Sequence, residues 1–292
     1  MSGTTSRHFS FESTGFNARL WQHNTDHSER FRSADRHITF LFFLAGAHAT
    51  RLSKTGDSPP CGGPGQAVII TDNELYRWYC EGPMVYLAIS MSDTLVDSVD
   101  TASNASLIKR AVASSIWFLD DCGLAQIAIQ IASQVVNDVE ERRHLNHSPL
   151  HKLWAGRIWN CSSRRLFDAK YGLLNRDDSD GSLLNEIAGR IDQRVSEPIS
   201  VPQLASEFSF SKRHFTRICL SSVGQTPHQF VLSRRLLRTR ELLYTRKNSL
   251  AEIALLSGFA SQSHMTSTFH KRLKMTPLQY QRALKDITLD QD

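Results

Sequence analysis

The sequence predicts an α+β protein with a β-rich N-terminal part and an all-helical C-terminal part. Residues 1–100 alternate short β-rich stretches with Gly, Pro, Asp and Asn, a pattern typical of an antiparallel sandwich or barrel. From about Thr101 the apolar residues follow a helical period instead. A length of 292 residues favours two domains over one.

The expected strands include FNARLWQH, HITFLFFLAG, GQAVIITD and VYLAISM, and residues 53–65 read as a turn-rich loop. Six aromatic residues gather in this region: Phe40, Phe42, Tyr76, Trp78, Tyr79 and Tyr86. They either fill a core or line a pocket for a small-molecule effector. Plain core is the simpler interpretation, because no convergent polar group accompanies them.

Two helices are expected next. Residues 122–143 place Leu124, Ile127, Ile131, Val135 and Val139 on one stripe. That stripe suits packing on the sheet, on the same helix of a second subunit, or on both. A second helix is expected over 151–172.

A polar segment, 175–182, then reads as a linker. The predicted domains are therefore 1–174, with a barrel over about 1–100 and helices over about 101–174, and 183–286.

The C-terminal part repeats itself. LASEFSFSKRHFTRI begins at Leu204, and IALLSGFASQSHMTSTF begins at Ile253. Each copy reads as a short apolar helix, a turn and a second helix opened by Ser, which is the pattern of a helix-turn-helix. The inward stripes are expected to be Leu204, Ala205 and Phe208 in the first copy, and Ile253, Ala254 and Leu256 in the second.

Capping signals mark the helix starts. Ser200 with Gln203 and Ser249 with Glu252 have the spacing of capping boxes. Thr226-Pro227 with Gln229 and Thr276-Pro277 with Gln279 follow the same logic, with Pro at the first helical position.

Polar residues at the start of each second helix are the candidate DNA-binding residues. In a major groove, Arg, Gln and Thr at these positions bond base edges. The expected set is Lys212, Arg213, Thr216 and Arg217 in the first copy, and Gln262, Ser263, Thr266 and Ser267 in the second. Basic residues such as Lys212, Lys271, Arg272 and Lys274 suit phosphates.

Between the copies, a helix of about twenty residues would span about 30 Å, close to one DNA turn of roughly 34 Å. Arg234, Arg235, Arg238 and Arg240 decorate it. Residues 181–285 hold 16 basic and 6 acidic residues, a net +10 within a chain of net +5. A local excess of this size indicates a polyanionic partner, with a solvated basic face as the alternative.

Residues 183–285 resemble the AraC/XylS transcription regulators, through SKRHFTRI, RRLLRTRELL and IALLSGFASQSHMTSTFHKRLKMTPLQY. The resemblance implies two helix-turn-helix units on promoter DNA, usually as an activator that contacts RNA polymerase. By the same resemblance, the residues expected to face DNA bases are Arg213, Thr216, Arg217, Gln262, Ser263, Thr266 and Ser267.

The second copy departs from the family pattern. Ser267 stands where Arg is common, His264-Met265 replaces a pair of aromatic residues, Thr239 replaces Ala in the spacer, and Lys274 stands where Gly is usual. We therefore expect the first copy to carry more of the specificity.

The N-terminal half resembles, in layout only, the cupin-like barrel and dimerisation helices of such regulators. That layout implies ligand sensing, homodimerisation, or both.

Catalysis is not expected. Metal-binding cupins carry a close His-x-His pair, and His37 and His48 stand apart. His144, His147 and His151 flank Ser148-Pro149 and read as surface residues. Cys61 lacks a visible resolving partner, and Cys219 reads as a small core residue. We expect no metal or other cofactor.

The compartment is read from the same sequence. The five dispersed cysteines indicate a reducing compartment. Neither an N-terminal signal nor a membrane span is visible, so a cytoplasmic location fits.

The function predicted from the sequence is that of a DNA-binding transcriptional regulator rather than an enzyme. One alternative is a cupin-type enzyme with a DNA-localising helical tail. Another is a nonspecific nucleoid-type binder driven by charge.

Overall fold

The computed structural model describes most of the chain. The described residues are 6–24, 27–32, 36–46, 50–53, 61–62, 67–70, 75–80, 82–100, 117–119, 122–140, 150–173, 179–223 and 225–288. Side chains are placed for only part of these ranges.

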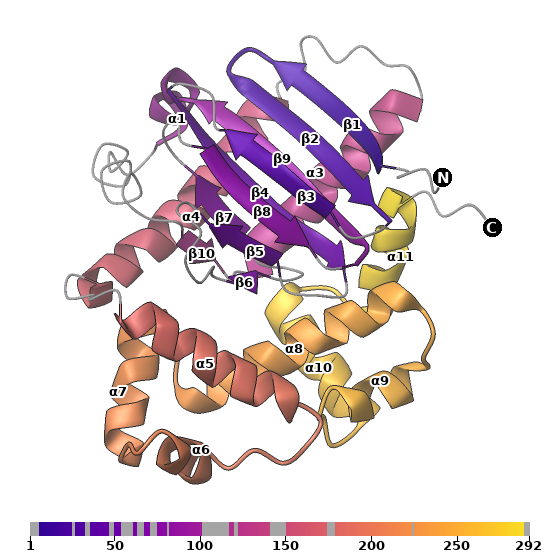
Figure 1. The fold of residues 1–292 in the computed structure, drawn as a ribbon. Helices are drawn as coiled ribbons and strands as arrows, with labels where there is room; N and C mark the ends of the chain where they lie inside the picture. The colour runs from indigo at the N-terminus through magenta and orange to yellow at the C-terminus, as the bar shows by residue number, and fades with distance from the viewer. Residues whose placement is uncertain are drawn as a thin grey trace.

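Within the described residues, ten strands form two antiparallel sheets (Figure 1). The larger sheet has the order β1 (Ser6–Ser13), β2 (Phe16–His23), β9 (Met84–Ser92), β4 (His37–Gly46), β7 (Ala67–Ile70) and β10 (Trp117–Leu119). The smaller has the order β3 (His27–Arg32), β8 (Leu75–Cys80), β5 (Thr50–Ser53) and β6 (Cys61–Gly62).

The N-terminal β-sheet domain is confirmed, but the closed cupin-like barrel is not seen. Over the described strands neither sheet closes on itself, because β1 and β10 are opposite edges of the larger sheet. The physical reason lies in β4, whose residues 38–46 are all buried. A strand buried on both faces suits the middle of a layered stack. The sequence also missed β10, which lies inside the segment expected to be helical.

The two faces of the larger sheet have different partners. One face contributes Phe40, Phe42 and Leu87 to a core that it shares with α3 (Cys122–Glu140) and α4 (Leu150–Leu173). The opposite face buries a second cluster that includes Leu41 and Tyr86. Phe40, Phe42 and Tyr86 are thus core residues, whereas the side chains of Tyr76, Trp78 and Tyr79 lie outside those described.

The helix α3 is enclosed within the chain. Its stripe residues Leu124, Ile127, Ile131 and Val135 are all buried, while Val139 lies outside the described side chains. It packs against β1, β2, β4 and α4, and also against α10 (Gln262–Leu273) and α11 (Pro277–Thr288). These four described residues of the stripe are therefore occupied by this chain's own elements.

The other helices in the described ranges are α1 (Asp93–Val99), α5 (Ser179–Gln193), α6 (Val201–Glu207), α7 (Lys212–Val223), α8 (Pro227–Thr245) and α9 (Leu250–Leu256). The helix α5 begins inside the segment expected to be the linker. Figure 1 shows α5 to α10 below the sheets, with α11 rising along the edge of the larger one.

The C-terminal helices do not share one core. Residues Ile187, Ile191, Leu204, Ala205, Phe215, Cys219 and Val231 form a separate cluster around α5, α6 and α7. By contrast, Ile253, Met265, Phe269 and Tyr280 belong to the same cluster as the β-sheet and α3. The second helix-turn-helix is therefore built onto the N-terminal domain, and the first has a core of its own.

A buried hydrogen bond joins the second unit to the sheet. The Tyr280 hydroxyl on α11 donates to the Leu44 carbonyl oxygen on β4, 2.7 Å away. Burial raises the pKa of Tyr280 to about 12, and the charge of Arg240 opposes this shift. Only 1% of Tyr280 and 3% of Arg240 is exposed, so both are sealed inside this contact.

Replacing Tyr280 by Phe keeps the ring and removes the hydroxyl. We expect Tyr280→Phe to lower the free energy of unfolding at pH 8 by about 1–3 kcal/mol, because the buried Leu44 carbonyl is left without its donor. Urea unfolding of the full chain measures this change.

The same variant tests the alkaline dependence. The folded-state pKa of Tyr280 is raised from 10.0 to about 12, so its contribution is present below pH 10 and is lost as the pH rises towards 12. Wild-type protein should therefore lose more stability than Tyr280→Phe between pH 9 and 11. Equal alkaline losses would mean that Tyr280 is not sealed in the contact.

Candidate nucleic-acid interface

The two C-terminal units share their turn geometry. Ser209 follows α6 with φ 56°, and Gly258 follows α9 with φ 76°. The two residues occupy equivalent places in the repeat, and both adopt the left-handed conformation that reverses the chain. In the second unit Gly meets this requirement without strain, whereas Ser209 carries a Cβ.

Each second helix is capped in the same way. The Ser211 hydroxyl oxygen accepts from the His214 backbone N–H at 3.2 Å, and Ser261 accepts from His264 at 3.1 Å. The histidine ring then packs on the phenylalanine of the preceding turn in both units. These contacts fix the start of α7 and α10, where the candidate DNA-binding residues lie.

The inward faces of α7 and α10 are also equivalent. Phe215 and Cys219 in the first, and Met265 and Phe269 in the second, are fully buried. Burial raises the pKa of the Cys219 thiol to about 11. The expectation of a small core residue at Cys219 is therefore confirmed.

All eight candidate residues lie on the outer faces of these helices. Thr216 and Thr266 are half-buried, and the other six are exposed: Lys212, Arg213, Arg217, Gln262, Ser263 and Ser267. The structure brings them together as two groups of four, each on the first two turns of its helix. Their contact with bases stays a prediction.

Three of these side chains have local partners. The Thr216 hydroxyl donates to the Lys212 carbonyl at 2.8 Å, so its methyl group and oxygen lone pairs remain available. The Ser267 hydroxyl donates to the His264 carbonyl at 3.2 Å. Arg217 Nη2 lies 3.0 Å from His214 Nδ1, a contact that positions the guanidinium group on the outer face.

The electrostatics of α7 and α10 suit a polyanion. Neither helix contains an acidic residue. Lys212, Arg213 and Arg217 are exposed on α7, and Lys271 is exposed on α10. The first unit therefore places its charge at the helix start, whereas the second places neutral Gln and Ser there and charge at its far end. A phosphate backbone would neutralise both sets.

Three of the four expected capping boxes form. Both bonds of the box are present at Thr226 with Gln229 and at Ser249 with Glu252, and the pair Thr276 and Gln279 makes the same two bonds. The Ser249 hydrogen bonds lower the pKa of Glu252. The box at Ser200 was predicted wrongly, because its side chain makes no capping bond.

One other expectation fails. Leu256 was expected in the buried stripe, but it is 41% exposed, and Ser257 takes the buried position instead. Of the arginines on α8, Arg240 is buried, and Arg234 and Arg238 are paired with Asp192 and Glu241. The 19 residues of α8 give a rod of about 28 Å, as expected.

Sequence reasoning missed the docking residue Tyr280. A signal was present, because the repeat aligns Tyr280 with Phe230. The two copies differ there by one hydroxyl, and that hydroxyl bonds the sheet.

The described part of the chain shows no metal site. Among those residues, no group of three or more His, Cys, Asp or Glu could hold a metal ion. His151 Nδ1 lies 3.2 Å from the Ser13 hydroxyl, whereas His144, His147 and the side chain of Cys61 are outside the described set. No helix there is long and apolar enough to cross a membrane.

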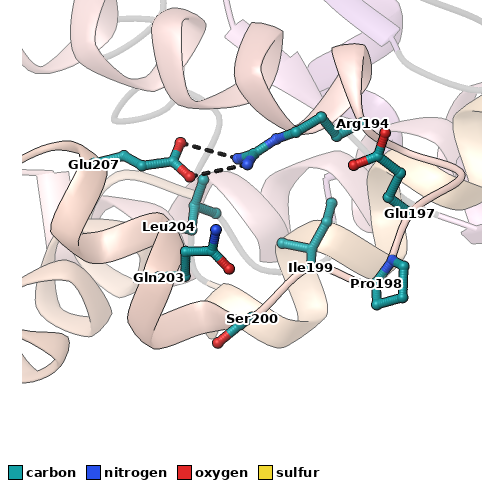
Figure 2. Close-up of a pocket in the computed structure, with 8 residues that line it drawn as sticks. All are labelled: Arg194, Glu197, Pro198, Ile199, Ser200, Gln203, Leu204 and Glu207. Atoms are coloured by element: carbon teal, nitrogen blue, oxygen red, sulfur yellow. Dashed lines mark hydrogen bonds and ion pairs between the residues drawn. The ribbon is translucent and has the colours of Figure 1, made fainter.

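A small polar pocket lies between α5 and α6 (Figure 2). Its volume of about 70 Å³ is far below the roughly 300 Å³ that drug-sized ligands need. Arg194 and Glu207 pair at its wall. It is therefore not a candidate effector site.

Comparison with known proteins supports the interpretation of this region. Residues 204–283 match the family described as "Helix-turn-helix domain". Over 91 residues the chain is 36% identical to the probable transcriptional regulator LumQ of Photobacterium leiognathi, covering 31% of this chain and 37% of that protein. Over 170 residues it is 27% identical to the transcriptional activator RhaS of Yersinia pestis, covering 56% and 57%.

One solved structure of a similar protein is the transcriptional regulator of Chromobacterium violaceum with an AraC-type DNA-binding domain. It is 26% identical and covers 38% of this chain and 96% of its own, with a TM-score of 0.35. The chain spans less than two thirds of the length of the curated relatives that it matches.

The fold and the family match together identify residues 204–283 as a helix-turn-helix domain. This part of the chain is similar to transcription regulators of the AraC/XylS type, as its sequence resemblance indicates.

The left-handed end of α10 gives a stability prediction. Lys274 adopts φ 55° there, which costs a residue with a Cβ about 1–2 kcal/mol. We expect Lys274→Gly to stabilise the protein by about 0.5–1 kcal/mol, because Gly avoids that cost but has more chain entropy to lose. Lys271→Gly, at an exposed position inside the helix, should destabilise by about 1 kcal/mol. Thermal unfolding compares the two, and a loss of stability in both would refute the assignment.

Arg217 gives a binding prediction. Arg217→Ala should weaken binding to the cognate site by about 1–3 kcal/mol and relax the preference at one base position. Arg157→Ala, at an exposed position on α4, is the matched control and should change neither. Titration of labelled duplexes measures both variants. An equal loss on random DNA would make Arg217 a phosphate contact instead.

Proposed function

We propose that the protein is a sequence-specific transcriptional regulator that binds double-stranded promoter DNA through α7 and α10. The observation that carries the proposal is the duplication of one capped, outward-facing recognition helix. Both copies bury the same face and expose polar residues on their first two turns. The start of such a helix is the part that reaches base edges in a major groove.

The spacing of the two helices supports a tandem reader. Successive major grooves on one face of DNA lie about 34 Å apart, and α8 is a rod of about 28 Å. Such a reader needs no palindrome, because one chain supplies both recognition helices.

The N-terminal domain is proposed to control this binding. The second unit shares a core with the β-sheet and α3, and Tyr280 bonds β4 directly. A small-molecule effector or other signal that shifts β4 or α3 would therefore act on α10 and α11 without an intermediate. Such a signal can change the occupancy of the DNA site only if it binds the DNA-binding arrangement of the protein and the inactive arrangement with different affinities.

Activation, with RNA polymerase as a partner, is proposed because the relative from Yersinia pestis is named a transcriptional activator. A homodimer is also proposed. Its contact would lie away from the buried stripe of α3, which is occupied within the chain.

The first test of the proposed function is selection of binding sites from a random duplex library by the full chain. We expect enrichment of one sequence with two protected major grooves about one turn apart, because each recognition helix occupies one groove. A charge-driven nonspecific binder would enrich no sequence, and that outcome would contradict the proposal.

The second readout is the salt dependence. The logarithm of the binding constant for the selected duplex should fall linearly with the logarithm of the salt concentration, because phosphate contacts release counterions. Affinity for a scrambled duplex should be lower at every salt concentration. Equal affinities for the two duplexes would mean that binding depends on charge alone and has no sequence specificity.

A further inference from the structure

A set of contacts joins the first helix-turn-helix unit to α8 and to the second unit. The end of α5 and the corner that follows it, residues 192–200, belong to the first unit. This segment meets α8 and the turn of the second unit at three points. Two arginines of α8, Arg234 and Arg235, supply two of these points, and Gly258 supplies the third.

The first contact fixes α5 on α8. Arg234 donates from Nε to Asp192 Oδ1 at 2.7 Å and from Nη2 to Oδ2. A bidentate pair of this kind fixes angle as well as distance. Arg234 is 14% exposed at its side chain and Asp192 is 42% exposed, so solvent screens the pair only on one side.

The second contact fixes the corner itself. Arg235 donates from Nη2 to the Glu197 carbonyl oxygen at 2.9 Å. The side chain lies between α8, the corner and the Gly258 turn. This burial lowers the pKa of Arg235.

The third contact brings the second unit against the same corner. A Cβ on residue 258 would lie 2.0 Å from the Val195 carbonyl oxygen and 2.8 Å from Arg235 Nε. Only Gly allows this approach, and its φ of 76° adds a second reason for Gly. The turn that precedes α10 therefore rests on the backbone of the first unit.

These contacts form a path between the recognition helices. The helix α5 packs on α7, and Gly258 lies three residues before the cap of α10 at Ser261. The two cores divide along α8, with Val231 in the first and Leu236 in the second. Arg234 and Arg235 lie between those residues, where a bend in α8 would turn one unit against the other.

We propose that Asp192, Arg234, Arg235 and Gly258 form a clamp that sets the distance and angular phase between the two recognition helices. The clamp thereby determines the half-site spacing that the protein accepts. These are positioning residues, which act through α7 and α10 rather than by touching DNA. The proposal rests on the proposed function.

The consequence for DNA is geometric. One inserted base pair moves a half-site by about 3.4 Å and rotates it by about 34° around the duplex axis. A rigid pair of helices cannot follow both changes, so one unit must leave its groove. A pair freed to pivot at residues 234–235 can follow them in part.

The test uses the full chain and the duplex that it selects from a random library. That duplex is compared with versions carrying one base pair more or one less between the two protected grooves. The variants are Arg234→Ala and the conservative Asp192→Asn. Arg194→Ala is the matched control, because Arg194 makes a bidentate pair with Glu207 at 2.9 Å at the same corner but within the first unit (Figure 2).

For wild-type protein, one inserted base pair should weaken binding by about tenfold or more, the loss expected when one unit's base contacts are broken. In Arg234→Ala and Asp192→Asn, affinity for the selected duplex should fall. The insertion penalty, which is the factor by which one inserted base pair weakens binding, should shrink by about threefold or more. Arg194→Ala should keep the wild-type penalty. The charge swap Asp192→Arg with Arg234→Asp should restore it.

Each contrary outcome has a distinct meaning. Weaker binding with an unchanged insertion penalty in both clamp variants overturns the clamp, as does a smaller penalty in Arg194→Ala. Selection of a site with only one protected groove overturns the clamp but leaves sequence-specific binding in place. Failure of wild-type protein to enrich any sequence overturns the proposed function, and the clamp with it.

Discussion

Burial of the second helix-turn-helix against the β-sheet is the interaction on which the rest of the structure depends. Phe269, Tyr280 and Leu284 share one apolar core with β4 and α3, and at its centre the Tyr280 hydroxyl bonds the Leu44 carbonyl. A buried carbonyl left without a donor would cost about 1–3 kcal/mol, so this position requires a donor in α11. The N-terminal domain and the second unit are consequently one packed body.

The first unit is attached to that body differently. Its own core holds α5, α6 and α7 together and includes Val231 of α8, and α7 also contacts α4. One ion pair, one hydrogen bond to a backbone carbonyl and the Gly258 approach add polar and close backbone contacts to α8 and the second unit. Polar contacts of this kind fix direction but add little stability when partly exposed. The helix α10 is thus embedded in the same core as the β-sheet, whereas α7 belongs to a separate core.

The sequence predicted much of the C-terminal fold, because its signals are local. Ser211, Thr226 and Ser249 each cap a helix as their spacing indicates, and the 3.6-residue period placed Phe215 and Met265 inside. It failed where position depends on distant partners. Leu256 looks inward on a helical stripe alone, yet Ser257 fills the buried position. The sequence contains no sign that Arg234 and Arg235 of α8 have partners, because Asp192 and Glu197 lie about forty residues away and approach them only in the fold. The sheet order, with β10 beside β7, is likewise set by pairing between residues far apart in the chain.

Native-state hydrogen exchange tests the shared core most directly. Amides of α10, α11 and the C-terminal half of α8 should open with the same free energy as those of β4 and α3, because one core closes them all. Amides of α5, α6 and α7 should open more easily. If α5 to α11 instead exchange as one unit that is distinct from β4 and α3, α10 is not built onto the N-terminal domain, and the account is wrong.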